Sequence, residues 1–333
     1  MRILVILFLG IVLLFAGASP TASMALIGRP IEPGGGPTEV RIQAALLDVD
    51  EIDASTQSFT ANFFLAARWV DARLAHKGPG RMVRPLDEVW NPQMQAVNQE
   101  RISTTFRPVV AIDPDGTVLY RQRAWGSFAQ PMDLREFPFD HQSFEIRIVA
   151  AGHTPKEVKW VPDPDRRSGL APKLSLADWE IGQWRLDISP YEPLAGESLA
   201  SFAFVLEAKR KVGFFIWKIL IPLIFIVAMS WIVFWIDPGQ TGTQIGVATT
   251  SMLTLIAYRF VIGGLLPRIS YLTRMDYFIL GSTLLVFASL VQAVVTALLA
   301  GNQQVQRARR IDHWCRGIFP ALFVALLMYS FVL

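Results

Sequence analysis

Hydrophobic and polar residues alternate along the first two thirds of the chain and give way to long apolar runs in the last third. Val40 to Ala44 and Phe144 to Ile148 both place an apolar side chain at every second position. Turn-forming groups of Asp, Pro and Gly separate such segments, as in residues 113–116 and 162–165. Period-two segments spaced by turns are typical of an all-β sandwich or barrel. We therefore predict an all-β sandwich of about ten strands over residues 38–211.

The apolar runs predict an all-α domain over residues 212–333 that crosses a lipid bilayer. Its expected helices are 214–236, 245–266, 277–300 and 311–333. A span needs about 20 mostly apolar residues, which these segments supply. The second segment also contains four hydroxyl side chains, at Thr249, Thr250, Ser251 and Thr254. A membrane helix of this kind is usually shielded by its neighbours or lines water.

The first 25 residues predict a secretory signal peptide. Arg2 precedes an apolar run from Ile3 to Phe15, and small residues follow it. The alternative, an uncleaved anchor helix, is disfavoured because the run is shorter than the roughly 20 residues of a span. The β domain is then exported, and the helices return the C-terminus to the same side. Arg307, Arg309 and Arg310 fall on the opposite side, as the positive-inside rule requires.

Composition excludes several classes of function. Charged residues make up 18% of the 333 residues and the net charge is +3, without the basic face that nucleic-acid binding needs. The single cysteine, Cys315, permits neither a disulfide framework nor a cysteine-based zinc site. The four histidines lack metal-ligand spacing, and no hydrolase, metalloprotease or P-loop motif occurs. We therefore expect no metal, no cofactor and no enzymatic activity.

One face of the second apolar segment carries a regular pattern, which we call the pore stripe. Its members recur at alternating steps of four and three: Gly246, Thr250, Leu253, Ala257, Phe260 and Gly264. Such spacing places them on one helix face. Around a common axis, the stripe would form a wettable inner end and two apolar constrictions, the gates at Leu253 and Phe260, where a channel can close by dewetting. The alternative is that both side chains pack against neighbouring helices.

Several motifs, in this order, resemble those of the pentameric ligand-gated ion channels, the Cys-loop receptor superfamily, in their bacterial form. The matching segments are Trp69-Val70-Asp71-Ala72-Arg73-Leu74, Trp90-Asn91-Pro92, Phe137-Pro138-Phe139-Asp140-His141-Gln142, Met252-Leu253-Thr254 and Leu266-Pro267-Arg268. Gln130 and Phe144 stand where eukaryotic receptors place two bridging cysteines, so the chain resembles the Cys-less prokaryotic branch. The resemblance implies a homopentamer around a central pore in the bacterial inner membrane.

The resemblance also implies an agonist site between neighbouring subunits. It maps Phe64 to one wall, and Tyr191 and Phe202 to a capping loop. Val97 and Ala151 occupy positions where other members have aromatic walls. A quaternary-amine cage is therefore disfavoured, because fewer ring faces attract the cation. A small amine, a proton, a divalent ion, another small molecule or no ligand stays open, as does an ordinary structural role for these aromatic residues.

Between the two domains, the resemblance implies a set of residues that couple ligand binding to the pore. They are Asp48, Glu51, Asp53, Pro138, Asp140, Arg210, Pro267 and Arg268. We expect Arg210 to form a partly buried, charge-assisted pair with a carboxylate. The alternative is a group of exposed charges worth under about 1 kcal/mol each.

The resulting functional hypothesis is a ligand-gated channel that conducts ions, with cations favoured over anions. Cation channels of this kind often carry acidic rings at the pore mouths, but Gly242, Thr243 and Gln244 occupy the inner mouth here. Cations are therefore expected from the resemblance to bacterial members. The alternative function is a non-conducting, membrane-anchored β-sandwich receptor or sensor.

Overall fold

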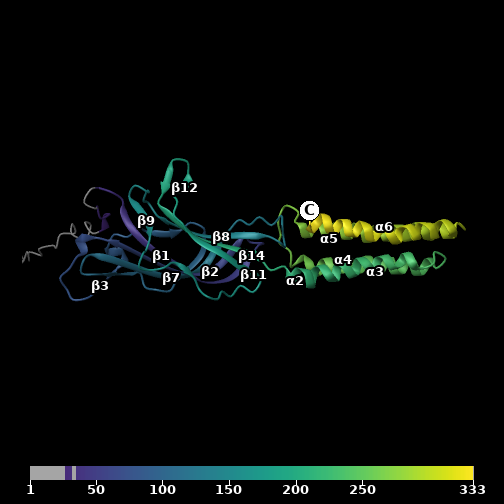
Figure 1. Ribbon diagram of the computed structural model, residues 1–333, viewed down its shortest axis with the longest axis horizontal. Helices are drawn as coiled ribbons and strands as arrows, with labels where there is room; N and C mark the ends of the chain where they lie inside the picture. The colour runs from purple at the N-terminus through teal and green to yellow at the C-terminus, as the bar shows by residue number, and fades with distance from the viewer. Residues whose placement is uncertain (1–26, 32–34, 333) are drawn as a thin grey trace, which may run out of the picture.

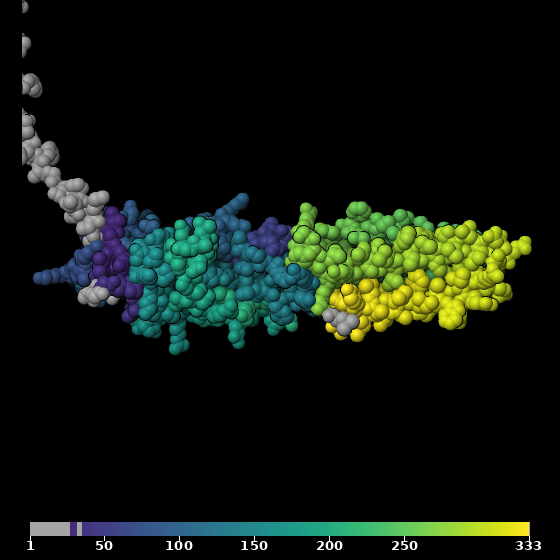
Figure 2. Space-filling view, turned by 90° about the horizontal axis from the view of Figure 1, so that it is seen from above, coloured from purple at the N-terminus to yellow at the C-terminus, as the bar shows by residue number. Residues whose placement is uncertain are grey.

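The computed structural model describes residues 27–31 and 35–332. The predicted signal peptide, residues 1–25, lies outside the described residues. The molecule is elongated, with a β domain at one end and a bundle of long helices at the other (Figures 1 and 2).

The β domain is a sandwich of two sheets. Its strands are β1 (Thr38–Asp53), β2 (Ser58–Val70), β3 (Met82–Pro85), β4 (Met94–Ala96), β5 (Gln99–Thr104), β6 (Val109–Ile112), β7 (Thr117–Ala129), β8 (His141–Ala150), β9 (Val158–Pro162), β10 (Gly169–Leu170), β11 (Trp179–Asp187), β12 (Tyr191–Leu194), β13 (Glu197–Leu199) and β14 (Ser201–Arg210). In one sheet the order is β10-β1-β2-β7-β6-β3, with β5 beside β7 and β9 beside β1. The other sheet is ordered β11-β14-β8-β4.

The alternating pattern explains how the two sheets pack. On β1 the side chains of Val40, Ile42 and Ala44 are buried, whereas Arg41 between them points outward. Aromatic rings close the space between the sheets: Phe63 meets Phe204 with ring centroids 6.2 Å apart. The predicted sandwich is confirmed. The described residues form fourteen strands rather than about ten, because short edge strands such as β10 carry too few residues to show an alternation.

Two short connections in the β domain are 3-10 helical, η1 (Ala72–Leu74) and η2 (Leu86–Glu88). The β12–β13 hairpin stands out from the sandwich as a separate arm (Figure 1).

Four helices within the described residues are long and apolar enough to cross a membrane, as the hydrophobic runs predict. The first span, Gly213–Trp235, consists of α2 (Gly213–Phe215), the π-helical turn η3 (Ile216–Leu220), α3 (Ile221–Trp231) and the 3-10 turn η4 (Ile232–Trp235). The others are α4 (Thr241–Gly263), α5 (Arg274–Gly301) and α6 (Val305–Phe331). The α6 helix begins six residues before the expected 311, because its first turns are helical but polar and hydropathy marks only the apolar part.

The π-helical turn has a local cause in Pro222. Proline lacks an N–H and its ring clashes with the carbonyl four residues earlier, which widens or kinks the helix. The carbonyls freed in this way still need a hydrogen-bond donor inside a membrane. The Tyr258 hydroxyl of α4 donates to the Ile219 carbonyl at 2.8 Å and lies 3.4 Å from that of Lys218. The outer part of α4 is therefore fixed to the first span.

Gly126 permits a close approach of strands β7 and β5. A Cβ atom at this position would lie 2.2 Å from the Arg101 carbonyl oxygen of β5, which is backbone and has little freedom to move. We predict that Gly126→Ala lowers the free energy of unfolding by about 1–3 kcal/mol, as overpacking does. The measurement is thermal unfolding of the purified protein in detergent. Gly317→Ala, which has no neighbouring atom within 4 Å, is the control and should leave stability unchanged or slightly higher.

Candidate functional site: the pore stripe and the domain junction

The α4 helix packs into the bundle through one face only. Its buried residues are Gln244, Ala248, Ser251, Leu255 and Ile262. At 100° per residue, this face and the pore stripe are centred about 180° apart on the helix. The pore stripe is accordingly exposed in the protomer, with Leu253 62% and Phe260 82% accessible. Among the described residues, neither side chain is buried against a neighbouring helix.

Hydroxyl groups along α4 bond to their own helix. The Thr250 hydroxyl donates to the Gly246 carbonyl at 2.8 Å, and the Thr254 hydroxyl donates to the Thr250 carbonyl at 2.8 Å. Such bonds to the preceding turn satisfy the hydroxyl hydrogens without a solvent partner. What Thr250 presents away from the helix is therefore an oxygen that accepts hydrogen bonds.

The junction between the domains is organised by one buried ion pair. Arg210, the last residue of β14, donates from Nε to Asp140 Oδ1 at 2.8 Å and from Nη2 to Oδ2 at 3.1 Å. Both residues are buried. The guanidinium carbon lies 4.2 Å from the centre of the Trp179 ring and 5.0 Å from that of Phe137. The expected charge-assisted pair is present, and two aromatic rings exclude water from it.

The segment that contains Asp140, the loop 130–140 with the first residues of β8 up to 144, also reaches the membrane helices. Phe137 packs edge-on against Phe215 of α2, with centroids 4.8 Å apart. Phe139 lies 5.7 Å from Phe331 near the end of α6. The peptide bond that follows Phe137 is cis, and Pro138 is buried. One loop of the β domain therefore contacts both the first and the last membrane helix.

The connection between α4 and α5 binds to the same loop. The Leu134 N–H donates to the Tyr271 hydroxyl at 2.9 Å, and the Arg274 N–H donates to the Arg135 carbonyl at 3.0 Å. Arg274 also pairs with Glu136 at 2.7 Å. These contacts link the loop to the segment that follows the pore stripe.

A junction cavity of about 360 Å³ separates the β1–β2 turn from the end of α4. Asp53, Arg210, Pro267 and Arg268 all contribute to its lining. The hydroxyl and the backbone N–H of Ser55 donate to Asp53 Oδ1 at 2.6 and 2.8 Å. These two bonds hold the pKa of the Asp53 carboxyl below its usual range, so that the carboxylate stays ionised. The cavity thus brings together charges of both signs from the two domains.

The other two predicted coupling acids of β1, Asp48 and Glu51, do not line this cavity. Asp48 accepts hydrogen bonds from the backbone and hydroxyl of Ser175, at 2.6 and 2.7 Å, in the segment before β11. Glu51 is exposed to solvent. Five residues of an extended strand separate Asp48 from Asp53, or about 17 Å. The coupling role of Asp48 stays a prediction, separate from the junction cavity.

The predicted ligand-site residues lie on different parts of the protomer. Phe64 is half-buried on the outer face of β2, where it meets the Phe106 ring edge-on at 6.5 Å. Tyr191 begins β12, on the projecting arm seen in Figure 1. The prediction for Phe202 is wrong: the capping hairpin ends at Leu199, and Phe202 is fully buried on β14 against Trp160.

Three contributors to these sites were missed from the sequence. Trp179 forms one wall around Arg210, Tyr271 receives the loop backbone, and Arg123 lies directly opposite Phe64 across the β2–β7 pair. No local motif marks any of them. Each one depends on a contact between residues far apart in the sequence.

Comparison with known proteins now identifies the family. The model of the neurotransmitter-gated ion-channel ligand binding domain matches residues 26–197, and that of the transmembrane region of these channels matches residues 219–304. The chain belongs to the neurotransmitter-gated ion-channel family.

Two relatives in this family are receptor subunits for γ-aminobutyric acid. The chain is 27% identical over 293 residues to the receptor subunit beta-4 of Gallus gallus, covering 84% of this chain and 60% of that subunit. It is 26% identical over 322 residues to the receptor subunit beta of Lymnaea stagnalis, covering 89% and 64% respectively. The chain therefore spans less than two thirds of the length of these two relatives.

In this channel family member, the ends of the segment 130–144 are held without a disulfide. The Gln130 side-chain oxygen accepts from the Glu145 N–H at 3.0 Å. Phe144 is buried, with its ring 5.3 Å from Phe59 and 5.5 Å from Trp179. Packing and a hydrogen bond therefore fix the two positions, Gln130 and Phe144, at which this chain has no cysteine.

The buried ion pair gives a stability prediction for the junction. Asp140→Asn leaves the Arg210 guanidinium buried without its counter-charge, and we predict a loss of about 3 kcal/mol in the free energy of unfolding. Thermal unfolding followed by tryptophan fluorescence measures the loss. The matched control is Glu207→Gln, which breaks an exposed 2.7 Å pair with Arg185 across β11 and β14 and should cost under about 1 kcal/mol. Equal losses in both variants would contradict the prediction.

Proposed function

We propose that five copies of this chain form a homopentameric ligand-gated ion channel whose pore is lined by the pore stripe of α4. The supporting observation is that the stripe faces away from the rest of the protomer. The side chains of Leu253 and Phe260 are exposed, so they face something outside their own bundle, either lipid or neighbouring copies. A ring of copies gives both residues a shared axis. The two gates are separated by seven residues, or about 10 Å of helical rise.

Ligand binding is proposed at the interface between copies. Phe64 on β2 and Tyr191 on the β12–β13 arm come from different sheets of one protomer. In a ring, the arm of one copy reaches the outer face of β2 in the next. Arg123, exposed beside Phe64, adds a positive charge for an anionic group on the ligand. The proposed ligand is a small extracellular molecule.

The ions conducted are proposed to be cations. Thr250 uses its hydroxyl hydrogen within the helix, so a ring of these side chains offers oxygen lone pairs to the pore. Oxygen ligands stabilise cations rather than anions. Arg259 lies about 140° from the centre of the pore stripe, and its charge points away from the axis.

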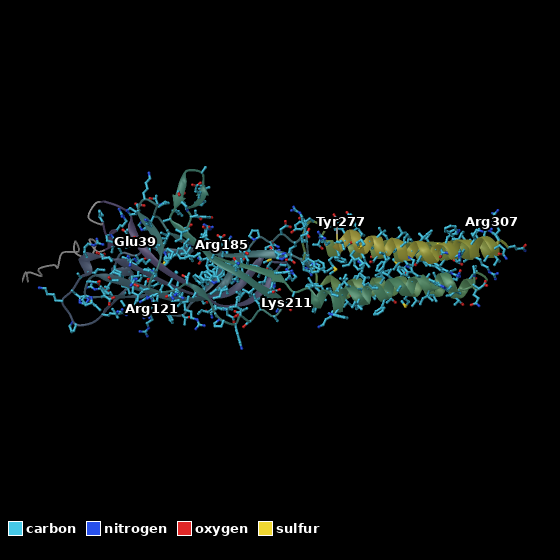
Figure 3. The ribbon with its side chains drawn as sticks, viewed as in Figure 1. Glu39, Arg121, Arg185, Lys211, Tyr277 and Arg307 are labelled. Carbon is cyan, nitrogen blue, oxygen red and sulfur yellow. The ribbon has the colours of Figure 1, made fainter. Side chains whose placement is uncertain are left out.

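We propose the bacterial inner membrane as the location, with the β domain and the end of α6 on the periplasmic side. Within the described chain, α5 and α6 are joined by only residues 302–304. Arg307 lies at the end of the bundle remote from the β domain, whereas Tyr277 lies beside that domain (Figure 3). This arrangement agrees with the positive-inside rule.

The gate is tested by placing a hydroxyl in the apolar ring. We predict that Leu253→Ser lowers the cost of wetting the constriction, shifts the population toward conducting forms and produces current without agonist. Recording from purified protein in planar bilayers under a potassium chloride gradient gives both the leak and, from the reversal potential, the charge selectivity. The matched control is Ile256→Ser, an exposed α4 position about 80° from the stripe centre. No leak, or an equal leak in both variants, would refute the assignment of the pore face.

The ligand site is tested with γ-aminobutyric acid and propylamine as probes. We predict that Phe64→Ala and Tyr191→Ala each raise the half-activating concentration of an effective probe about tenfold, since each removes an aromatic wall. The same substitutions added to Leu253→Ser should leave its agonist-independent current unchanged, which shows that the pore is intact. An unaltered dose response would place the ligand elsewhere. A pentamer mass in detergent is required by the whole proposal, and a stable monomer or dimer would contradict it.

A further inference from the structure

A carboxylate is buried at the inner end of the helix bundle, the end remote from the β domain. Asp312 of α6 is 1% accessible. The cations nearest to it on α6 are engaged elsewhere: Arg309 pairs with Asp237 at 2.7 Å, and Arg316 donates to the Phe234 carbonyl at 3.0 Å. Neutral side chains hold the carboxylate instead. Gln292 Nε2 of α5 donates to Asp312 Oδ1 at 2.5 Å, and Gln244 Nε2 of α4 approaches Oδ2 at 3.5 Å.

The Gln244 side chain connects this carboxylate to the rest of the bundle. Its Nε2 also donates to the Ile236 carbonyl at 2.9 Å, just beyond the end of the first span. Its Oε1 lies 3.4 Å from the hydroxyl oxygen of Thr296 on α5, a hydroxyl that is also 3.1 Å from the Gln292 and Ala293 carbonyls of its own helix. We call Gln244, Gln292, Thr296 and Asp312 the inner polar network. Residues of α4, α5 and α6 and the end of the first span all meet in it.

Stability alone does not account for a charged group at this place. A buried charge without a cationic partner is costly unless hydrogen bonds satisfy it, and apolar side chains of equal volume often stabilise a protein as well or better. Hydrogen bonds are directional, however, and a buried polar network can fix one relative position of the groups it joins. Gln244 lies only two residues before Gly246, the first member of the pore stripe. The network therefore holds α4 at the inner mouth of the proposed pore.

We propose that Asp312 is a positioning residue for the inner pore mouth, acting through Gln292 and Gln244 to hold the first turns of α4 in place. This inference rests on the proposed channel function. It assigns to α6, which lies outside the pore stripe, control over the geometry of the conducting path.

The experiment exchanges the partners across the α5–α6 contact. Gln292→Glu sets two carboxylates against each other, and Asp312→Asn sets two amides together. The double variant Gln292→Glu with Asp312→Asn restores an amide–carboxylate pair with its direction reversed. Each is made in the full chain carrying Leu253→Ser, so that the channel is open without agonist. The control is Gln306→Glu, the same change at an exposed position of α6.

Two measurements read the result. Hydrogen exchange of the α4 amides of residues 245–250 should be about tenfold faster in Gln292→Glu and should return toward the parent rate in the double variant. The interaction energy between two contacting residues is of a size that changes exchange rates by about this factor. Single-channel conductance should change about twofold or more in Gln292→Glu and recover in the double variant, because it reports the geometry of the mouth rather than the number of channels. Gln306→Glu should alter neither.

The outcomes separate the two proposals. Unchanged exchange and conductance in Gln292→Glu, or no recovery in the double variant, would overturn the role of Asp312 while leaving the channel intact. If the Leu253→Ser parent carries no current, the assignment of the pore face fails, and this inference fails with it as a statement about a pore. Hydrogen exchange then still decides whether Asp312 fixes α4. Should Gln292→Glu fail to fold, recovery of folding and of parent exchange rates in the double variant supports the proposal, and a misfolded double variant contradicts it.

Discussion

The ion pair between Arg210 and Asp140 is the contact on which the relation of the two domains depends. Arg210 ends β14 and directly precedes the first membrane span, so its position fixes where the chain enters the bundle. Asp140 belongs to the loop that contacts α2 and α6. Because the pair is buried between the rings of Phe137 and Trp179, it is not exchanged freely for bonds with water. Any movement of the loop must therefore move the end of β14, or break the pair at the full cost of an uncompensated charge.

The α4 helix is held at both ends and left free along its middle. Near the outer end, Tyr258 donates to the Ile219 carbonyl in the π-helical turn that precedes Pro222. At the inner end, Gln244 donates to the Ile236 carbonyl, where the first span terminates. Both anchors therefore use irregular parts of the first span, where backbone carbonyls lack a partner within their own helix. Between them, the pore stripe has no such tie to its own bundle, as a gate that rearranges would require.

The sequence predicted most of the architecture because its signals are local. The alternation along β1 and the apolar runs of the helices depend only on neighbouring residues, and both were confirmed. Helix ends were predicted less well, since the first turns of α6 are polar yet helical. Phe202 was misplaced because loop length, unlike strand alternation, leaves the register open. Trp179, Tyr271 and Asp312 act through contacts between distant segments, which no local pattern contains.

A closed gate of the proposed kind depends on the change from polar to apolar side chains along the pore as much as on the apolar ring itself. Leu253 is three residues from Thr250, so about 4.5 Å of helical rise separates the hydroxyl oxygen level from the apolar level. Water can bind to the threonine oxygens, but the ring of Leu253 side chains next to them offers no hydrogen-bond partner. The boundary between the hydrated and the dry part of the pore is therefore abrupt. Phe260 would form a second dry ring, with the small residue Ala257 between the two. Two short dry rings separated by a wider segment can wet one at a time, whereas a continuous apolar wall of the same length would have to wet as a unit. In the proposed channel, the pattern of large and small residues on α4 therefore favours a pore that is closed at rest and that a modest rotation or tilt of its helices opens.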